Sequence, residues 1–329
     1  MKTVLVCGGA GYIGSVMTAY LRRNGIDVVV ADSLVTGHRE AVGDARLYIG
    51  DLRDKDFLRG VFSENEIDGV VDFAAFSQVG ESVAEPIKYY ENNTQSVLSL
   101  LTVMREYGVK NLVFSSTAAV YGEPESQPIC ETAKTEPTNP YGATKLAVEG
   151  ILKWCSRAYG MRYMALRYFN ASGADTESCV GEDHSPETHL IPLVLKTALG
   201  QRGGIGVFGT DYPTRDGTCV RDYIHVEDLA RAHLLALEYL ERGGESGSIN
   251  LGSGDGFTVL EIIEKAREIT GRQIEAFPAP RREGDPSTLI ASNEKAYEVL
   301  GWRPEKTLSD MIGDAWQWHL THPEGYKTL

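Results

Sequence analysis

A tyrosine and a lysine four residues apart could form a catalytic base. Tyr141 and Lys145 stand just before a run of apolar residues with helical spacing, so both fall on one face of the first turns of a helix. An ammonium beside a phenol favours the phenolate, and lowering a tyrosine pKa by about three units corresponds to about 4 kcal/mol. The alternative is a pair that only shares a solvated helix face. This spacing is common by chance, so the surrounding elements must show whether the pair is a catalytic base or a surface pair.

A glycine-rich loop near the amino terminus predicts a dinucleotide site. The apolar run 3–7 has strand length and leads into the loop, and helical spacing follows. Gly8 would allow the tight turn, Gly11 the close approach of a pyrophosphate, and Gly14 the packing of helix on strand. The next strand ends in Asp32, whose carboxylate can hold both ribose hydroxyls and would repel a 2′-phosphate. A glycine loop alone could be a tight turn, but this setting predicts NAD.

Further apolar runs of strand length predict an α/β fold with a doubly wound parallel sheet of Rossmann type. They cover residues 46–49, 69–75, 111–114 and 163–167. Ligands bind such sheets at the carboxyl ends of the strands. The fourth strand ends there in Phe73, Ala74 and Ala75, and the fifth ends in Ser115, Ser116 and Thr117. Strand-end hydroxyls often only cap turns, so they are weak evidence by themselves.

Two polar residues allow two interpretations each. Asp51 could accept a hydrogen bond from an adenine amino group, or it could begin the helix that follows. Asn92 lies near the start of a helix predicted over residues 89–107, where it could be buried beside the cofactor or be a surface amide. The sequence does not separate these alternatives.

The alternation of strands and helices weakens beyond residue 170. We therefore expect an NAD-binding Rossmann domain over 1–170 and mainly a substrate-binding lobe over 171–329, with some segments returning to the sheet. Two loop stretches there, 218–225 and 280–286, carry arginines, whose guanidinium groups match phosphate oxygens. A surface arginine with a local acid partner is the alternative, and we favour it for Arg281.

The composition limits the class of partner. The 329 residues contain 32 Lys and Arg against 46 Asp and Glu, a formal net charge of −14, which opposes binding to nucleic acid and to anionic membranes. The longest apolar runs are far too short to span a bilayer, and the amino-terminal sequence does not have the pattern of a signal peptide. Five scattered cysteines without a CxxC pair predict reduced thiols in a cytoplasmic protein and no metal site.

Taken together, these motifs resemble the extended short-chain dehydrogenase/reductases, and more closely the UDP-glucose 4-epimerases. The resemblance runs through 79–82, 220–225, 281–285 and 322–326 to the end of the chain. It implies NAD-binding roles for Gly8, Gly11, Tyr12, Ile13, Gly14, Asp32, Asp51, Leu52, Phe73, Ala74, Ala75, Asn92, Tyr141, Lys145 and Phe169. It implies substrate-binding roles for Thr117, Asn170, His189, Leu190, Phe208, Arg221, Arg282, Asp285 and Leu289.

The chain departs from the resembled family at a few positions. Asp72 stands where many members have histidine, and Ser77 replaces a frequent lysine near the nicotinamide, which bears on how strongly the cofactor is held. Thr117 keeps the hydroxyl of the usual serine, so the proton path should survive. His189 replaces an asparagine that is common beside the nucleotide.

The resemblance implies NAD-dependent epimerisation at C4 of a UDP-hexose through a transient 4-keto sugar, with Tyr141, Lys145 and Thr117 as the catalytic residues. UDP-glucose and UDP-galactose are the expected pair, in galactose metabolism. Leu289 is smaller than the tyrosine found in many members at the hexose wall, so N-acetylated sugars should be turned over less well but measurably. A homodimer is also implied.

Two other functions share parts of this sequence pattern. A nucleotide-sugar 4,6-dehydratase shares the scaffold and the 4-keto intermediate, but its family places Asp-Glu after the threonine, where this chain has Ala118 and Ala119. A nucleotide-sensing regulator without turnover typically lacks the tyrosine or the lysine, and both are present here.

Overall fold

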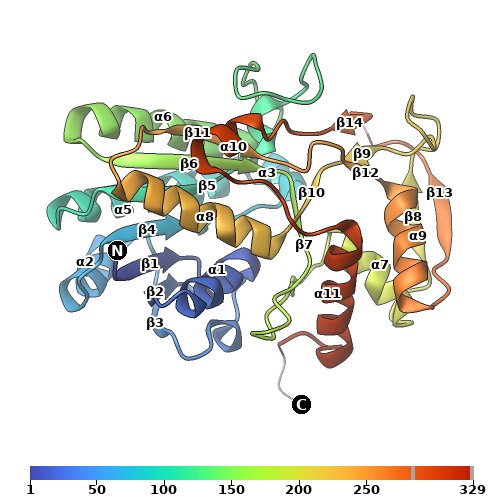
Figure 1. Cartoon of the computed structure of the whole chain (residues 1–329), viewed down its shortest axis with the longest axis horizontal. Coiled ribbons are helices and arrows are strands. Elements are labelled where there is room, and N and C mark those ends of the chain that lie inside the picture. Colours follow the sequence, from blue (N-terminus) through green and yellow to red (C-terminus); the bar gives the residue numbers. More distant parts are fainter. Residues whose placement is uncertain (283–285, 327–329) are drawn as a thin grey trace.

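A seven-stranded parallel sheet forms the larger part of the molecule (Figure 1). The computed structural model describes residues 1–282 and 286–326. The strand order is β11-β6-β5-β4-β1-β2-β3, which reverses direction about β1 and β4 as in a doubly wound sheet. The strands are β1 (Thr3–Cys7), β2 (Asp27–Asp32), β3 (Arg46–Ile49), β4 (Gly69–Asp72), β5 (Asn111–Thr117), β6 (Arg162–Tyr168) and β11 (Gly247–Leu251). The predicted fold class is confirmed.

Helices cover both faces of this sheet, and the alternation along each strand explains why. In β1, Val4 and Val6 belong to the core under α1 (Tyr12–Arg23) and α8 (Val226–Glu241). Leu5 and Cys7 point to the opposite core. That second core is completed by α2 (Lys55–Glu64), α5 (Gln95–Glu106) and α6 (Pro140–Tyr159). The apolar runs of the sequence are therefore strands buried on both sides.

The carboxyl-terminal half contributes one strand to the sheet. β11 pairs in parallel with β6 from Gly247↔Met164 to Leu251↔Tyr168. The preceding helix α8 packs against α1 on the same face of the sheet. The division of the chain at residue 170 remains a proposal.

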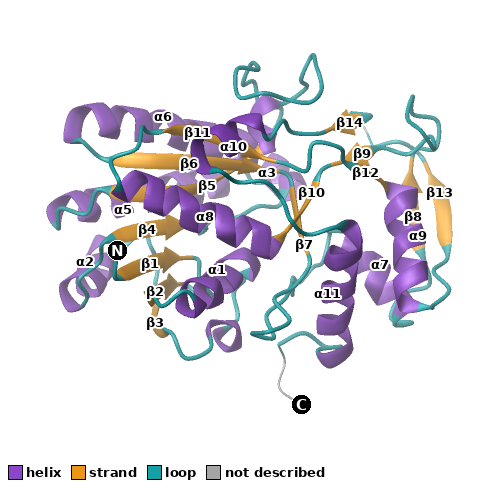
Figure 2. Ribbon diagram, in the orientation of Figure 1, coloured by secondary structure: helices purple, strands orange, loops and turns teal. Residues whose placement is uncertain are grey.

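A smaller lobe lies beside the carboxyl ends of the strands (Figure 2). Its core joins α7 (Leu190–Ala198), α9 (Val259–Thr270) and α11 (Leu308–Thr321). Short strands surround them: β7 (Asn170–Ser172) with β10 (Tyr223–His225), β8 (Ile205–Phe208) with β13 (Ala276–Ala279), and β12 (Phe257–Thr258), β9 (Val220–Arg221) and β14 (Thr288–Leu289) together. α10 (Glu294–Leu300) lies near β11 and α8.

Several elements end elsewhere than the sequence predicts. The fourth strand stops at Asp72, because its partner β1 turns into the glycine loop after Cys7. The fifth strand ends with Ser115, Ser116 and Thr117 as predicted, because pairing with β6 persists to Thr117↔Tyr168. The helix expected over 89–107 consists of consecutive stretches, which are α4 (Pro86–Tyr89), a π-helical turn (Tyr90–Thr94) and α5. α3 (Val79–Ala84) precedes it, and 3-10 turns cover Arg39–Val42 and Ala118–Tyr121.

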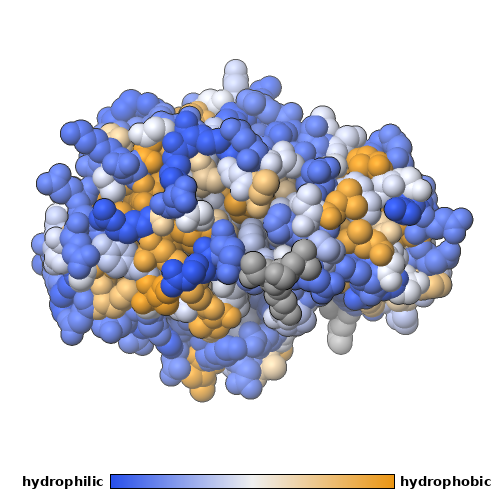
Figure 3. Space-filling model, turned by 90° about the horizontal axis from the view of Figure 1, so that it is seen from below, coloured by the Kyte–Doolittle hydropathy of each residue, from blue (hydrophilic) through white to orange (hydrophobic). Residues whose placement is uncertain are grey.

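The surface agrees with the acidic composition. The face in Figure 3 is largely hydrophilic, with separate apolar patches. Among the described residues, no helix combines the length and the apolar character that crossing a bilayer requires.

Candidate functional site

The glycine loop between β1 and α1 forms a cradle at the carboxyl edge of the sheet. Gly8 has φ +72°, and a Cβ there would lie 2.7 Å from the backbone N of Ala74. A Cβ on Gly14 would lie 2.1 Å from the carbonyl O of Gly8, so helix and loop touch only because both residues lack side chains. A Cβ on Gly11 would meet only the Gly8 oxygen, at 3.5 Å. Packing within the chain therefore does not require a glycine at position 11.

The start of α1 suits an anion. Gly11 is the N-cap residue and gives the helix no side-chain hydrogen bond, and the first turn holds no acidic residue. The backbone N–H groups and the positive end of the helix dipole therefore point at the space above the loop. This is the arrangement that a dinucleotide pyrophosphate requires.

Asp32 is fixed where β2 ends. Its side chain is buried, Oδ2 accepts from the N–H of Ala10 at 2.9 Å, and Oδ1 accepts from the N–H of Leu34 at 2.8 Å. Both oxygens thus have their positions set by backbone donors before any ligand arrives. A carboxylate held in this way can accept hydrogen bonds from two ribose hydroxyls, and it disfavours a phosphate in their place.

The Tyr141 and Lys145 pair is placed by the amino-terminal cap of α6. The side chain of Asn139 accepts from the N–H of Gly142 at 2.9 Å, and Pro140 occupies the first helical position. Lys145 is only 3% exposed, and its Nζ donates to the carbonyl of Ser115 at 2.7 Å. The lysine is therefore tied to the end of β5 rather than to solvent, which argues against the interpretation of a shared surface face.

Burial dominates the electrostatics of this pair. It lowers the pKa of Lys145 to about 8, and the nearby Asp72 opposes the lowering. It raises the pKa of Asp72 to about 6 against the effect of Lys145. Burial also raises the pKa of Tyr141, which a hydrogen bond with Thr117 partly offsets. The surrounding protein groups alone thus keep the phenol protonated, and a further cation would favour the phenolate.

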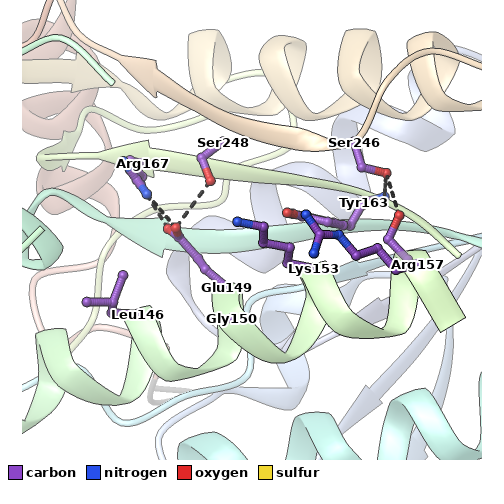
Figure 4. A pocket seen from close by; sticks show the side chains of 10 residues that line it. Leu146, Glu149, Gly150, Lys153, Arg157, Tyr163, Arg167, Ser246 and Ser248 are labelled. Atoms are coloured by element: carbon purple, nitrogen blue, oxygen red, sulfur yellow. Dashed lines mark hydrogen bonds and ion pairs between the residues drawn. The ribbon is translucent and has the colours of Figure 1, made fainter. Parts of the chain in front are cut away.

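A buried polar network behind α6 holds the helix against the sheet (Figure 4). Glu149 Oε1 accepts from Ser116 Oγ at 2.6 Å and from Arg167 Nε at 2.9 Å. Its Oε2 accepts from Ser248 Oγ at 3.1 Å, so α6 is joined to β5, β6 and β11. A cavity of about 630 Å³ opens beside this network, lined by Lys153 and others. None of the predicted catalytic residues lines it, so we assign the network a positioning role.

Asn93 is a positioning residue that the sequence did not single out. It is buried, its Oδ1 accepts from the N–H of Phe76 at 2.8 Å, and its Nδ2 donates to the Phe76 carbonyl at 2.9 Å and to Thr144 Oγ1 at 3.2 Å. It therefore ties the loop after β4 to α6. The neighbouring Asn92 is half-buried and donates to the Asn93 side chain at 3.0 Å. Two adjacent asparagines in the sequence could have indicated a buried amide. Which of the two side chains faces inward depends on how the helix is wound at that point.

The remaining cofactor positions lie around the same edge. Asp54, not Asp51, caps α2, accepting from the N–H of Asp56 at 2.8 Å. Asp51 instead pairs with Arg53 at 2.6 Å, so the helix-start interpretation of Asp51 is wrong. Leu52 is buried, and half-buried residues continue the chain after β4. Tyr12 and Ile13 follow β1, Leu52 follows β3, and Phe73, Ala74 and Ala75 follow β4, so all six come after the carboxyl ends of parallel strands.

Phe169 and Leu289 pack on one small apolar core, on which Leu146 of α6 also packs. The buried residues of this core are Val120, Tyr121 and Ile129. β14 brings Leu289 there by pairing in parallel with β9. The next residue after Phe169, Asn170, donates from Nδ2 to the carbonyl of Asp222 at 2.9 Å.

The other predicted substrate positions lie farther out. Arg221 is half-buried in β9, and its guanidinium donates to the carbonyl of Val220 at 2.7 Å. Arg282 is exposed and lies 4.1 Å above the ring of Phe208, at the end of β8. Arg281 is engaged by Asp211 at 2.8 Å, the local partner that the sequence favoured. Asp285 lies outside the described residues.

His189 and Leu190 begin α7, with His189 as the N-cap residue. His189 Nδ1 lies 2.6 Å from Glu182 and 3.3 Å from Glu187. Burial lowers its pKa, but the two carboxylates outweigh that effect and raise the pKa to about 10. Whether His189 also meets substrate stays a prediction.

Comparison with known proteins agrees with this geometry. Residues 4–252 match the NAD dependent epimerase/dehydratase family. The chain is 56% identical to the UDP-glucose 4-epimerase of Halalkalibacterium halodurans, over 99% of this chain and 98% of that one. A crystal structure of UDP-glucose 4-epimerase superposes with TM-score 0.98 at 53% identity, covering 99% and 100% of the two chains. The enzyme from Bifidobacterium longum in complex with NAD+ and UDP gives 0.92 at 40%, with coverage of 99% and 100%.

The resemblance inferred from the sequence motifs is therefore confirmed, with matches that span nearly the whole chain. The chain belongs to the NAD dependent epimerase/dehydratase family, in which these relatives are UDP-glucose 4-epimerases.

Proposed function

We propose that this chain catalyses the NAD-dependent epimerisation of a UDP-hexose at C4, interconverting UDP-glucose and UDP-galactose through a transient 4-keto sugar. The observation that carries the proposal is the placement of Tyr141 and Lys145. The lysine is buried and bonded to the end of β5, at the sheet edge that the glycine cradle also faces. The relatives named above act in the same reaction class.

The residues present fit NAD. The side-chain-free cradle at Gly8, Gly11 and Gly14 leaves room for a pyrophosphate at the uncapped start of α1, and Asp32 suits an unphosphorylated ribose. Lys145 would also hold the nicotinamide ribose. When bound, NAD+ supplies the acceptor for the C4 hydride and later returns that hydride.

Tyr141 accepts the proton of the C4 hydroxyl, directly or through Thr117. Thr117 is suited to a relay because it ends β5 beside Tyr141 and hydrogen-bonds with it. Lys145 stabilises the phenolate by its charge, which a dry site makes more effective than it would be in water. In the return half of the reaction, Tyr141 gives the proton back to the C4 oxygen.

The nucleotide half of the substrate must stay fixed while the sugar turns. We assign this anchoring to Asn170, Leu190, Phe208, Arg221 and Arg282, with Asp285 and His189 as further candidates. The guanidinium groups match the diphosphate oxygens, whereas the hexose meets mainly the apolar surface at Leu289 and Phe169. A keto sugar that is held only through its phosphate linkage can present either face, so hydride return gives either C4 epimer.

The Leu289 wall bears on sugar choice. Leucine leaves more room than tyrosine, so we propose that UDP-N-acetylglucosamine and UDP-N-acetylgalactosamine are also interconverted, less well than the plain hexoses. The alternative is that Leu289 only packs, as its contact with the core of Val120, Tyr121 and Ile129 also allows.

Proton NMR on purified protein with UDP-galactose tests the proposal. We expect UDP-glucose to form without added NAD+, because each cycle regenerates the oxidised cofactor. A 4-keto-6-deoxy product would indicate a dehydratase, and binding without turnover would indicate a regulator. Either result would overturn the proposed function.

We also propose a homodimer that functions in the cytoplasm, in galactose metabolism. α5 and α6 adjoin, since Arg105 lies 4.2 Å above the ring of Tyr159, and they expose Leu98 and Trp154, the latter by 68%. Such side chains suit an interface between helices of two copies. Light scattering should give the mass of a dimer at micromolar concentration, and Trp154→Lys should shift it toward a monomer. A monomeric parent protein would refute this assembly.

A further inference from the structure

Two glutamates and two histidines converge in the segment before α7, outside the catalytic residues. We call Glu182, His184, Glu187 and His189 the Glu/His cluster. Each residue offers one oxygen or nitrogen atom, and these atoms all lie within 4.8 Å of one another. Glu182 Oε1 lies 3.2 Å from His184 Nδ1 and 2.6 Å from His189 Nδ1, and Glu187 Oε2 lies 3.8 Å from His184 Nδ1.

Two of these atoms have no hydrogen-bond partner. Glu187 Oε1 accepts from the N–H groups of Thr188 and His189, but its Oε2 is buried without a donor, on a side chain 4% exposed. His184 Nδ1 is likewise buried without a hydrogen-bond partner, although Glu182 Oε1 lies 3.2 Å from it as an ion-pair contact. A buried carboxylate oxygen without a donor is costly, so the arrangement calls for a positive group between these atoms.

The only basic side chains of the described residues that pair with these carboxylates are His184 and His189 of the cluster itself, and they leave Glu187 Oε2 without a hydrogen-bond donor. Neither Glu182 nor Glu187 pairs there with a lysine or an arginine. A second cluster offers the contrast, since His225, Glu227 and Asp314 also lie close together. There Lys306 Nζ supplies the positive charge, at 2.9 Å from Glu227 and 3.4 Å from Asp314.

We propose that the Glu/His cluster binds one divalent transition-metal ion, with Zn²⁺ as the best fit. Two carboxylates balance the charge of the ion, and two imidazoles select a borderline ion over Mg²⁺ or Ca²⁺. Four ligands at about 2.1 Å in a tetrahedron lie about 3.4 Å from one another, within the range of the separations found here. The two carboxylates are buried while the histidines reach the surface, which leaves an entry path.

The absence of a CxxC pair predicted no metal site, and the Glu/His cluster replaces that prediction. Its four residues lie within eight positions of the chain, but a pattern of glutamate and histidine is also typical of ordinary salt bridges. Only the folded loop shows that the four donor atoms converge.

The ion would join the two halves of the molecule. The ring of His184 contacts the edge of Tyr12, the first residue of α1, with centroids 6.4 Å apart. His189 is the N-cap residue of α7, directly before Leu190. The metal would therefore fix the segment between the cofactor cradle and the nucleotide lobe. This role is structural, because all four protein donors fill a tetrahedral shell and leave no position for substrate.

The test measures metal content in tag-free, full-length protein. After dialysis in metal-free buffer, mass spectrometry of the elements should give about one Zn²⁺ per chain. Removal of the metal with a strong chelator should lower Tm by roughly several degrees. Addition of one equivalent of ZnCl₂ should restore the original Tm. Metal content and Tm do not depend on turnover, so this test is separate from the test of epimerase activity.

Variants identify the ligands. His184→Gln and Glu187→Gln should each lose most of the bound zinc and the response of Tm to chelator, while the control His322→Gln, outside the cluster, should keep both. Parent protein without zinc and without a Tm response to added ZnCl₂ would overturn the site and leave an ion-pair cluster. Equal zinc binding by the variants and the parent would also overturn it. If a variant fails to fold, the site is tested on the parent protein alone, by its zinc content and by the change of Tm on chelation and on addition of ZnCl₂.

Discussion

The cofactor edge of the sheet and the nucleotide lobe are built by different means. At the cofactor edge, polar groups are buried and held by backbone atoms, as Lys145 is by the Ser115 carbonyl and Asp32 by the N–H of Ala10. In the lobe, Arg282 is exposed and stacks on the ring of Phe208. The first region therefore holds its polar groups buried and hydrogen-bonded to the backbone, whereas the second presents a charged group to solvent.

This difference separates two kinds of contribution to rate. Groups in a dry, preorganised site act most strongly in the transition state, so their loss should lower kcat. Exposed cations hold the substrate and the transition state alike, so their loss should mainly raise KM. Substitutions in the two regions should therefore differ in which constant they change, as well as in magnitude.

The largest effect is expected for Tyr141→Phe, which removes only the phenol oxygen. Turnover should fall by about 10²–10⁴-fold or more, because the proton acceptor is lost. Folding and bound NAD(H) should be retained, which far-UV circular dichroism and absorbance at the nicotinamide band would show. If the variant kept a near-normal kcat, Tyr141 would not be the proton acceptor, and the expected difference between the two regions would not hold.

The next effect is expected for Arg282→Ala, with Arg281→Ala as the matched control. Loss of a charge-assisted contact to the diphosphate should raise KM for UDP-galactose by about 10- to 100-fold, with a much smaller change in kcat. Arg281 is occupied by Asp211, so its variant should stay close to the parent. Equal effects of the two variants, or a loss confined to kcat, would contradict the assignment of nucleotide binding to Arg282.

A smaller effect is expected for Asp72→Asn, and it should depend on pH. Lys145 loses its charge as the pH rises through its pKa of about 8, and Asp72 raises that pKa. Without Asp72 the lysine should become neutral at lower pH, so kcat/KM should begin to fall earlier on the alkaline side. Below about pH 6 Asp72 is itself protonated, so the variant and the parent should converge there.

The control for this prediction is Asp68→Asn, at the opposite end of β4. Among the described residues, the donors to the Asp68 carboxylate are the N–H groups of Lys2 and Thr3. Profiles of kcat/KM against pH should move for Asp72→Asn and not for Asp68→Asn. Superimposable profiles for all three proteins would show that Asp72 does not act on the lysine.

The smallest effect is expected for Leu289→Tyr, and it should be selective. The added bulk should lower kcat/KM for the N-acetylhexosamine pair by about 10-fold and leave the glucose and galactose pair nearly unchanged. Leu146→Met is a suitable control, because Leu146 packs on the same small core without lying in β14. An equal decrease for both sugar pairs would mean that Leu289 is not the selector.

The features predicted from the sequence are those that depend on local spacing. The glycine loop, the strand that ends in Asp32 and the helix that carries Tyr141 and Lys145 each lie within a short stretch of chain. The hydrophobic periodicity and the turn residues of these stretches were therefore sufficient to predict them from the sequence. The end of the fourth strand was misplaced at residue 75 instead of Asp72, because pairing with the neighbouring strand decides where a strand stops.

The features that the sequence did not reveal depend on distant partners or on helical phase. Glu149 is buried because Arg167, Ser116 and Ser248 converge on it from three strands. Asn93 rather than Asn92 faces inward, because the helix is wound as a π-helical turn there. No spacing rule predicts either arrangement.

In the proposed reaction, the hydride leaves C4 of the sugar and returns to C4 at the cofactor edge of the sheet, while the sugar turns between the two steps. The most direct measurement uses UDP-galactose with deuterium at C4 and follows the UDP-glucose product by NMR. Deuterium should be retained at C4 of the product without loss to water, because the transferred hydride stays on the bound cofactor between the two steps. Washout of the label into solvent, or its transfer to added NAD+, would contradict the claim.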